Sequence, residues 1–317
     1  MLFPMNLPIY PEWTKLELNH QRDIKSLLKT LSDGISEYTF AGLFLFRNNY
    51  TYRISLTPSF CEERKGQLMV SGTQRNSEGE EETFVMLPQG FPGIRLVDEL
   101  LEQFCGIKNL SEHEAETHRI EIERRGYCVL QDRDNFDYIY TRKDLAELSG
   151  KKFHKKRNLV NGFVNNYSYE EKRITGSNRC DLYTILEVWK SEREDPADYA
   201  SAKEAIDLIE ELNLRGCITY VDGKPSAFSM GEVFNQGSMF ALHFEKAIGS
   251  YRGIYQFINQ SFASMMDESI LYINREQDLG DQGLRQAKMS YRPTGFVKKY
   301  RICSSSFSPC EELEELT

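Results

Sequence analysis

The sequence predicts an α/β protein that is built from two consecutive domains with mixed sheets. Its 317 residues suffice for about two domains of ordinary size. Strand-like and helix-like segments alternate in both halves, and 40% hydrophobic with 27% charged residues can bury a core, which excludes global disorder. We expect a first domain over residues 1–150, a second over 151–303, and a flexible acidic tail over 304–317.

In the first half, periodicity and turn residues define the expected elements. Apolar residues at helical spacing predict a helix over 22–31. A capping box of Ser111 and Glu114 predicts the start of another helix, which Gly126 ends. The remaining elements are a hairpin of strands 40–46 and 50–56, a second hairpin of strands 67–73 and 82–88, a helix over 94–104, and short strands at 128–131 and 137–141.

The second half begins with helices and continues with a strand meander. An amphipathic helix follows residue 151, and apolar stripes predict two more helices near 182–189 and 206–212. The Asp222-Gly223 pair is a strong hairpin signal. The later elements are strands at 216–221, 224–234 and 238–245, a helix at 252–266, a strand at 270–274, a helix at 280–289 and a last strand at 295–302. The two halves share this general order, so an internal duplication is a hypothesis.

Composition excludes several function classes. No apolar run reaches the roughly eighteen residues of a spanning helix, and the N-terminus lacks the features of a signal peptide, so we expect a soluble cytoplasmic protein. The seven cysteines are odd in number and scattered without a CxxC, which favours reduced thiols over a disulfide frame or a zinc site. The five histidines show no metal-ligand spacing, so no metal is expected.

One basic run stands out on an acidic chain. The net charge of −9 argues against a general nucleic-acid coat. Basic residues at the start of a helix oppose its dipole, which favours a ligand at that place. We interpret the run as a candidate ligand contact, with a solvated basic face as an alternative of at least equal weight. Its members are Lys151, Lys152, Lys155, Lys156 and Arg157.

Two motifs and the element order carry a family resemblance. A three-stranded meander followed by helix, strand, helix and strand is the order of GNAT-type acyltransferases. The stretches HKKRNLVNGF (154–163) and NREQDLGDQGLRQAKMSYRP (274–293) resemble the lysylphosphatidylglycerol synthase C-terminal domain family, including its stand-alone soluble members. The resemblance implies two tandem GNAT-like domains, kinship with aminoacyl-tRNA-dependent transferases, and acyl-CoA or aminoacyl-tRNA as co-substrate instead of a permanently bound cofactor. Fold membership does not fix the substrate.

The strand at 238–245 and the segment after the strand at 270–274 supply the candidate catalytic groups. Alternation places His243 and Glu245 on one face, where they are candidates to deprotonate an amine. Glu276 follows a buried strand, at the end where ligands of mixed sheets tend to lie, and is a further candidate base. Tyr291 is a candidate proton donor, as the GNAT resemblance suggests. The alternatives are a core hydrogen bond for His243, a solvated Glu245, and a salt-bridged helix surface.

Further residues are assigned to substrate and donor. Near the same strand end, the predicted substrate-binding residues are Asn274, Arg275, Asp278 and Lys288, although Asp278 is alternatively a helix cap. A glycine turn before the helix at 252–266 is predicted to hold the donor through free backbone N–H groups. The turn residues are Gly249, Arg252 and Gly253; the glycine spacing departs from the GNAT motif, and a simple helix-capping turn is the alternative.

Together with these residues, the resemblance implies an acyltransferase that moves an acyl or aminoacyl group from an activated carrier to an amine or hydroxyl. Its partners would be a small-molecule donor and acceptor, with tRNA contacting the basic run. The alternative is a catalytically silent binding module for a charged small molecule or a protein partner. The transferase hypothesis requires that the glycine turn before Tyr255 and the polar cluster after Tyr272 open onto a common groove.

Overall fold

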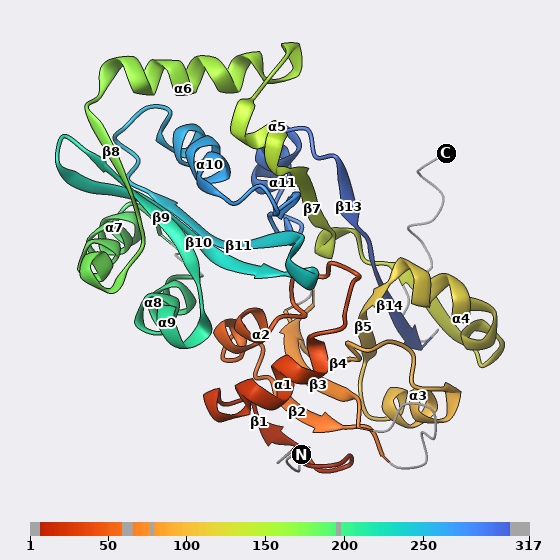
Figure 1. Ribbon diagram of the computed structural model, residues 1–317. Coiled ribbons are helices and arrows are strands. Elements are labelled where there is room, and N and C mark those ends of the chain that lie inside the picture. The colour runs from red at the N-terminus through yellow and green to blue at the C-terminus, as the bar shows by residue number, and fades with distance from the viewer. Residues whose placement is uncertain (1–6, 59–65, 77–78, 195–197, 305–317) are drawn as a thin grey trace. The chain divides into compact units, whose positions relative to one another are not determined.

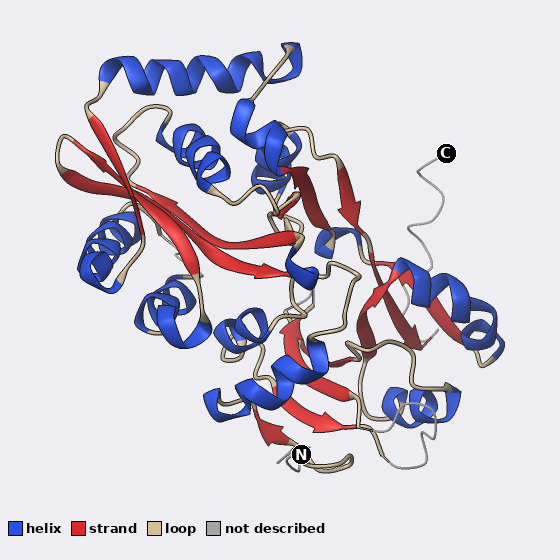
Figure 2. Ribbon diagram, viewed as in Figure 1, coloured by secondary structure: helices blue, strands red, loops and turns tan. Residues whose placement is uncertain are grey.

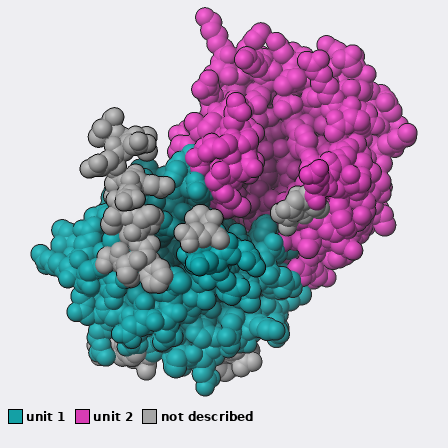
Figure 3. Space-filling view, turned by 180° about the vertical axis from the view of Figure 1, so that it is seen from behind, with its two compact units in different colours: residues 1–136, 297–317 teal, residues 137–296 magenta. Residues whose placement is uncertain are grey.

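The structure, a computed structural model, describes residues 7–58, 66–76, 79–194 and 198–304 (Figures 1 and 2). The predicted acidic tail lies outside these residues except for Ser304. The chain forms two compact units (Figure 3). Unit 1 comprises residues 1–136 and 297–317, and unit 2 comprises residues 137–296. The division thus differs from the expected one near residue 150, because the strand after Phe136 joins unit 2 and the last strand returns to unit 1.

Unit 1 contains a seven-stranded mixed sheet in the order β1-β2-β3-β4-β5-β14-β6. Its core is made by apolar side chains of the sheet and of the helices that follow β4 and β5, such as Val85, Leu100, Ile107 and Ile122. The strands are β1 (Thr14–Lys15), β2 (Arg53–Leu56), β3 (Leu68–Arg75), β4 (Glu81–Met86), β5 (Gly106–Ser111), β6 (Tyr127–Gln131) and β14 (Lys299–Ser304), and the helices are α1 (Gln21–Leu28), α2 (Phe40–Phe46), α3 (Ile94–Leu101) and α4 (Glu112–Arg124).

Unit 2 contains a second seven-stranded mixed sheet, in the order β13-β7-β12-β11-β10-β9-β8. Helix α10 covers one face of its central strands and α7 covers the other (Figure 2). The strands are β7 (Asp137–Thr141), β8 (Tyr169–Arg173), β9 (Arg215–Val221), β10 (Lys224–Phe234), β11 (Met239–Ala247), β12 (Tyr272–Asn274) and β13 (Gly295–Val297), and the helices are α5 (Arg142–Glu147), α6 (His154–Asn166), α7 (Arg179–Ser191), α8 (Tyr199–Asp207), α9 (Ile209–Leu212), α10 (Ile254–Met265) and α11 (Gln282–Met289).

The two units repeat one topology. Unit 1 runs through the meander β2-β3-β4, then α3, β5, α4 and β6, and unit 2 runs through the meander β9-β10-β11, then α10, β12, α11 and β13. In each, the last meander strand pairs in parallel with the next strand. The predicted α/β class with two tandem domains of GNAT-like strand order is therefore confirmed.

Each unit also receives one strand from a distant part of the chain. Strand β14 lies between β5 and β6 in unit 1, and β7 lies between β12 and β13 in unit 2. The sequence after β6 therefore completes unit 2, and the sequence after β13 completes unit 1. This exchange also splits the single strand that we predicted over 295–302 into β13 and β14.

The prediction of a strand over residues 40–46 is wrong, because this segment is helix α2. Thr39 caps the helix by accepting a hydrogen bond from the Gly42 N–H at 2.9 Å. Every residue from Phe40 to Leu45 is buried. A short run that is apolar on all sides has neither helical nor strand periodicity, so the pattern could not distinguish the two structures. The other predicted helices and strands are present with ends shifted by a few residues, except that the helix predicted near 206–212 is divided between α8 and α9 at Leu208.

Gly162 offers a test of the helix assignment for α6. A Cβ added there would meet no atom within 4 Å. We expect Gly162→Ala to raise the free energy of unfolding by about 0.5–1 kcal/mol, because alanine loses less backbone entropy in a helix. Urea denaturation measures the change. A loss of stability would contradict a regular, open helix at this position.

Candidate functional site

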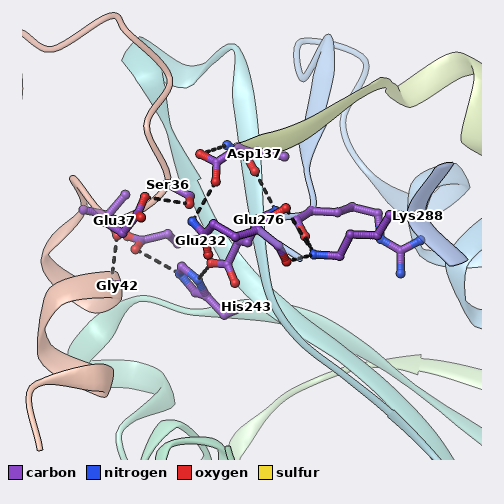
Figure 4. Close-up of polar contacts among 12 residues, drawn as sticks. Ser36, Glu37, Gly42, Asp137, Glu232, His243, Glu276 and Lys288 are labelled. Atoms are coloured by element: carbon purple, nitrogen blue, oxygen red, sulfur yellow. Dashed lines mark hydrogen bonds and ion pairs between the residues drawn. The ribbon is translucent and has the colours of Figure 1, made fainter. Parts of the chain in front are cut away.

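His243 of β11 lies between two carboxylates inside unit 2 (Figure 4). Its Nδ1 is 2.7 Å from Glu276 Oε1, its Nε2 is 3.2 Å from Glu232 Oε1, and its side chain is 0% exposed. Burial lowers the pKa of His243, but the charges and hydrogen bonds of Glu276 and Glu232 outweigh it and raise this pKa to about 10. At neutral pH the ring is therefore an imidazolium that donates a hydrogen bond to each glutamate.

This protonation changes the predicted roles. An imidazolium has no lone pair with which to accept a proton, so His243 does not fit the role of a base near neutral pH. The geometry of His243 agrees with the alternative interpretation, in which this side chain is hydrogen-bonded inside the core. Glu276, whose side chain is 18% exposed, remains as the candidate base. Glu232 was missed, although a single carboxylate inside the otherwise uncharged stretch 225–234 was a signal.

A tightly bonded loop holds Glu276 after β12. Glu276 has a φ of +57°, a left-handed conformation that is unusual for glutamate. The ammonium of Lys288 donates hydrogen bonds to the backbone carbonyls of Arg275 at 2.6 Å and Glu276 at 3.1 Å, and also to that of Gln277. Burial, followed by the charge of Arg275, lowers the pKa of Lys288 to about 8. Lys288 was predicted to bind substrate, whereas the structure places it as the anchor of this loop.

Asp278 and Asn274 also form buried hydrogen bonds that support the loop after β12. Burial favours the neutral form of Asp278, but hydrogen bonds from Arg285 and Tyr138 outweigh it and lower the pKa of Asp278 to about 2. Asn274 donates to Asp137 at 3.0 Å. Both residues are fully buried, so neither has the exposure that our substrate-binding prediction requires. The cap of α11 is Asp281, which accepts from the Leu284 N–H.

A second group of polar side chains, the Tyr291 cluster, adjoins the loop. It consists of Lys156, Glu245, Gln256, Arg275 and Tyr291. Arg275 donates to Glu245 at 2.8 Å, and its guanidinium carbon is 5.3 Å from the centre of the Tyr291 ring. The Lys156 Nζ is 4.0 Å from the same ring centre, and Gln256 of α10 hydrogen-bonds Tyr291. Burial raises the pKa of Tyr291 well above its usual value, which keeps its hydroxyl protonated.

The Tyr291 cluster joins segments that the sequence did not connect. Lys156 comes from the basic run, Gln256 from the first turn of the helix after the glycine turn, and Arg275 from the segment after β12. Gln256 in the first turn of α10 and Arg275 after β12 thus contact the same Tyr291 side chain, and a common groove for the glycine turn and the polar segment after Tyr272 stays a prediction. One alternative interpretation of the sequence was a solvated Glu245, but the structure shows its carboxylate in an ion pair with Arg275.

The glycine turn is occupied by contacts within unit 2. The Gly249 N–H already donates to the carboxylate of Glu192, at 3.0 and 3.2 Å. Gly253 precedes α10 with a φ of +90°, and a Cβ there would collide with the Leu159 carbonyl of α6. Arg252 is exposed. These contacts give the two glycines packing and turn roles, and donor binding at this turn stays a prediction.

The basic run separates into different environments. Lys152 pairs with Asp144 at 2.7 Å, and Arg157 donates to the Gly150 carbonyl at 2.9 Å. Lys151 and Lys155 are exposed. Lys156 is half-buried and reaches the Tyr291 cluster, because it lies on the side of α6 that faces the cluster. Contact of the run with RNA stays a prediction.

The described residues contain neither a metal-ligand cluster nor a membrane-spanning helix. Across the described ranges, no three histidine, cysteine or acidic side chains are grouped so that they could hold a metal ion. None of the helices in those ranges has the length and apolar character that crossing a membrane requires.

Comparisons with known proteins agree with this architecture. A protein of unknown function from Bacteroides thetaiotaomicron VPI-5482 is 29% identical, with a TM-score of 0.76 over 92% of this chain and 99% of that one. The structure of L-PGS from Bacillus licheniformis has a TM-score of 0.58 at 13% identity over 91% of this chain and 93% of that one, which shows a shared fold.

A curated relative matches over part of its length. The uncharacterized protein MYCGA3080 of Mycoplasmoides gallisepticum is 26% identical over 178 residues, which are 52% of this chain. This chain spans 55% of the length of that relative.

The model of the family "Phosphatidylglycerol lysyltransferase, C-terminal" matches residues 28–303. The match extends through both units, and the chain therefore belongs to the family of the phosphatidylglycerol lysyltransferase C-terminal domain.

Proposed function

We propose that this protein transfers an acyl or aminoacyl group from an activated carrier to an amine or hydroxyl. The main support is the position of the Glu276 carboxylate. Strands β11 and β12 pair only from Met239 to Ala241, and β11 then continues while the chain after β12 turns away. Glu276 lies at this separation, where the carboxyl end of a strand in a mixed sheet tends to carry the ligand site. His243 and Lys288 fix it there.

The proposed step uses two groups of the site. Glu276 takes the proton of the acceptor as its nitrogen or oxygen attacks the carbonyl carbon of the donor. The bond from that carbon to the carrier oxygen or sulfur then breaks, and the protonated Tyr291 hydroxyl supplies a proton to the leaving atom. Such donors are already activated, so positioning of the two reactants supplies much of the rate, up to roughly 7–11 kcal/mol of barrier.

The carrier and acceptor are part of the proposal. The relationship to the phosphatidylglycerol lysyltransferase family favours an aminoacyl group, with aminoacyl-tRNA as the carrier and Lys156 of the basic run near the reacting groups. Acyl-CoA is less favoured, because the Gly249 N–H is already bonded to the Glu192 carboxylate, which would repel a pyrophosphate. The acceptor is a small amine or alcohol.

Turnover of labelled donors tests the proposal. The protein is incubated with a pool of charged tRNAs, or with acyl-CoAs, and a library of amines and alcohols, and loss of the acyl group is followed. We expect Glu276→Gln to slow transfer by about 10²–10⁴-fold, the usual contribution of a positioned base. Glu268→Gln, on an exposed glutamate of the same unit, should keep the wild-type rate. Full activity of Glu276→Gln would contradict the assigned base.

A binding module without catalysis is the second candidate. It is favoured by the ion pair between His243 and Glu276, which stabilises the carboxylate and weakens it as a base. The two functions differ in one measurement. A donor that raises the melting temperature of the wild-type protein but is never consumed, with any acceptor, would support binding alone.

A further inference from the structure

The sheet of unit 2 ends in a strand whose outer edge is open. Strand β8 is the last strand in the order of this sheet, and among the described strands it pairs with β9 alone (Figure 1). Four of its five residues are exposed, and the remaining one, Glu171, is half-buried. An open edge presents backbone N–H and C=O groups that a further strand can bind.

The register with β9 identifies which backbone groups of β8 point outward. Just beyond the two ends of β8, the Ser168 carbonyl accepts a hydrogen bond at 2.8 Å and the Ile174 N–H donates one at 3.0 Å, each with the residue opposite it on the β9 side. Hydrogen-bonded pairs alternate along an antiparallel ladder, so the even-numbered residues of β8 bond to β9. The odd-numbered residues Tyr169, Glu171 and Arg173 therefore direct their N–H and C=O groups away from the sheet.

A turn limits the open edge at one end. The Asn178 side chain donates to the Arg173 carbonyl at 2.9 Å and accepts from the Thr175 N–H at 2.8 Å. In the part of the chain that the structure describes, no hydrogen-bond partner is found for the outward N–H groups of residues 169, 171 and 173 or for the carbonyls of 169 and 171. The open edge is thus centred on Glu171.

Two copies of this edge can pair about a two-fold axis beside Glu171. In an antiparallel pair, outward groups bond to outward groups, so the Glu171 N–H of each copy donates to the Glu171 carbonyl of the other. This register places Glu170 opposite Lys172 of the second copy, and Tyr169 opposite Arg173 of the second copy. A register shifted by one position places two Glu170 or two Lys172 side chains opposite each other, which is unfavourable.

The charges of β8 are complementary to themselves in the register centred on Glu171. Within one strand, Lys172 Nζ is 3.1 Å from Glu170 Oε2, and the two side chains are 48% and 64% exposed. In the paired strands these four charges alternate in sign, so that each has opposite charges as its nearest neighbours. The two Glu171 side chains flank the axis, but each accepts a hydrogen bond from Ser261 of α10. Burial raises the pKa of Glu171 to about 7, which reduces their repulsion.

We infer that two copies of this chain form a two-fold dimer through their β8 strands, which joins two seven-stranded sheets into one of fourteen strands. A second copy is favoured over a strand of another protein, because its charges match those of the first in the register that the open edge selects. The contact is small, so we expect a dissociation constant on the order of 1–100 µM. This dimer is independent of the transfer chemistry proposed for unit 2.

Exchange of charges between two variants tests the dimer. In sedimentation velocity, the full-length wild-type protein should change from monomer to dimer between about 1 µM and about 1 mM. Glu170→Lys and Lys172→Glu each place like charges opposite one another, so each variant alone should dimerise at least about tenfold more weakly. An equimolar mixture of the two should recover wild-type dimerisation, because every lysine then lies opposite a glutamate.

Two further variants locate the contact. Lys203→Glu, on an exposed lysine of α8, makes the same charge change as Lys172→Glu and should dimerise like the wild type. Glu171→Pro removes the outward donor at the axis but no hydrogen bond to β9, and it should stay monomeric. The charge exchange decides the matter if the proline variant does not fold.

Several outcomes would overturn the dimer. They are a wild type that stays monomeric up to about 1 mM, single charge variants that dimerise like the wild type, and a mixture of these variants that stays monomeric. A folded Glu171→Pro that dimerises normally, or a Lys203→Glu that does not dimerise, would equally move the contact away from β8.

Discussion

Replacing His243 by glutamine is expected to lower the free energy of unfolding at pH 7 by about 3–5 kcal/mol. The imidazolium is the buried cation that compensates Glu232 and Glu276, and its side chain is 0% exposed. Without it, two carboxylates face each other in a site with little solvent. Denaturation in urea measures the loss, and an unchanged slope would show that the unfolded states are comparable.

The effect should depend on pH in a defined direction. The folded-state pKa of His243 is raised to about 10 from an ordinary value of 6.5. The stability that this proton contributes is therefore fully present below pH 6.5 and is lost as the pH rises toward 10. The difference in stability between wild type and His243→Gln should shrink over that window. A constant difference from pH 6 to pH 10 would contradict an imidazolium in the folded protein.

His118 provides a matched control for this variant. It also lies between two glutamates, at 3.6 Å from Glu114 and 3.7 Å from Glu121, but its side chain is 24% exposed and on the surface of α4. We expect His118→Gln to change stability by less than about 1 kcal/mol, because solvent screens exposed ion pairs. Equal losses in the two variants would show that burial is not the cause.

Replacing Lys288 by methionine is expected to lower the free energy of unfolding by about 3 kcal/mol or more. Methionine retains the apolar stem but leaves the backbone carbonyls of residues 275, 276 and 277 without their donor, at a cost of about 1–3 kcal/mol for each that stays buried. Amide hydrogen exchange of residues 275–281 should accelerate with the global loss. The proposed transfer activity should fall because Glu276 loses its fixed position.

Lys298 is the control for Lys288. Its ammonium pairs with Glu112 at 2.5 Å, but the side chain is 41% exposed. Lys298→Met should therefore cost no more than about 1 kcal/mol and leave exchange of residues 275–281 unchanged. If Lys288→Met were equally mild, the three hydrogen bonds to backbone carbonyls would not hold the loop.

Local signals in the sequence predicted much of the fold. Ser111 caps α4 as expected, because a cap depends on residues three positions apart. The Asp222-Gly223 pair forms the turn between β9 and β10. Residues 40–46 were assigned wrongly because an apolar run lacks periodicity. The strand exchange was not predictable, since β7 and β14 look like ordinary next strands along the chain.

The candidate site was predicted by residue type more than by role. The segment after β12 does carry a dense polar network, but its contacts join residues more than a hundred positions apart, such as Tyr138 with Asp278. Sequence spacing cannot show such contacts, so Asp278 and Lys288 were assigned to substrate although they hold the loop. Lys156 lay in a run of similar bases, and only packing of α6 against the cluster distinguishes it.

The exchange of β7 and β14 limits how this chain can be divided. A fragment that ends at residue 136 would have a gap between β5 and β6 where β14 belongs, and a fragment that starts at residue 151 would lack β7. Both missing strands are internal to their sheets, so each fragment would expose unpaired backbone edges. Truncation of the gene at the midpoint should therefore yield insoluble halves, because each unit needs a strand that the other half of the sequence encodes.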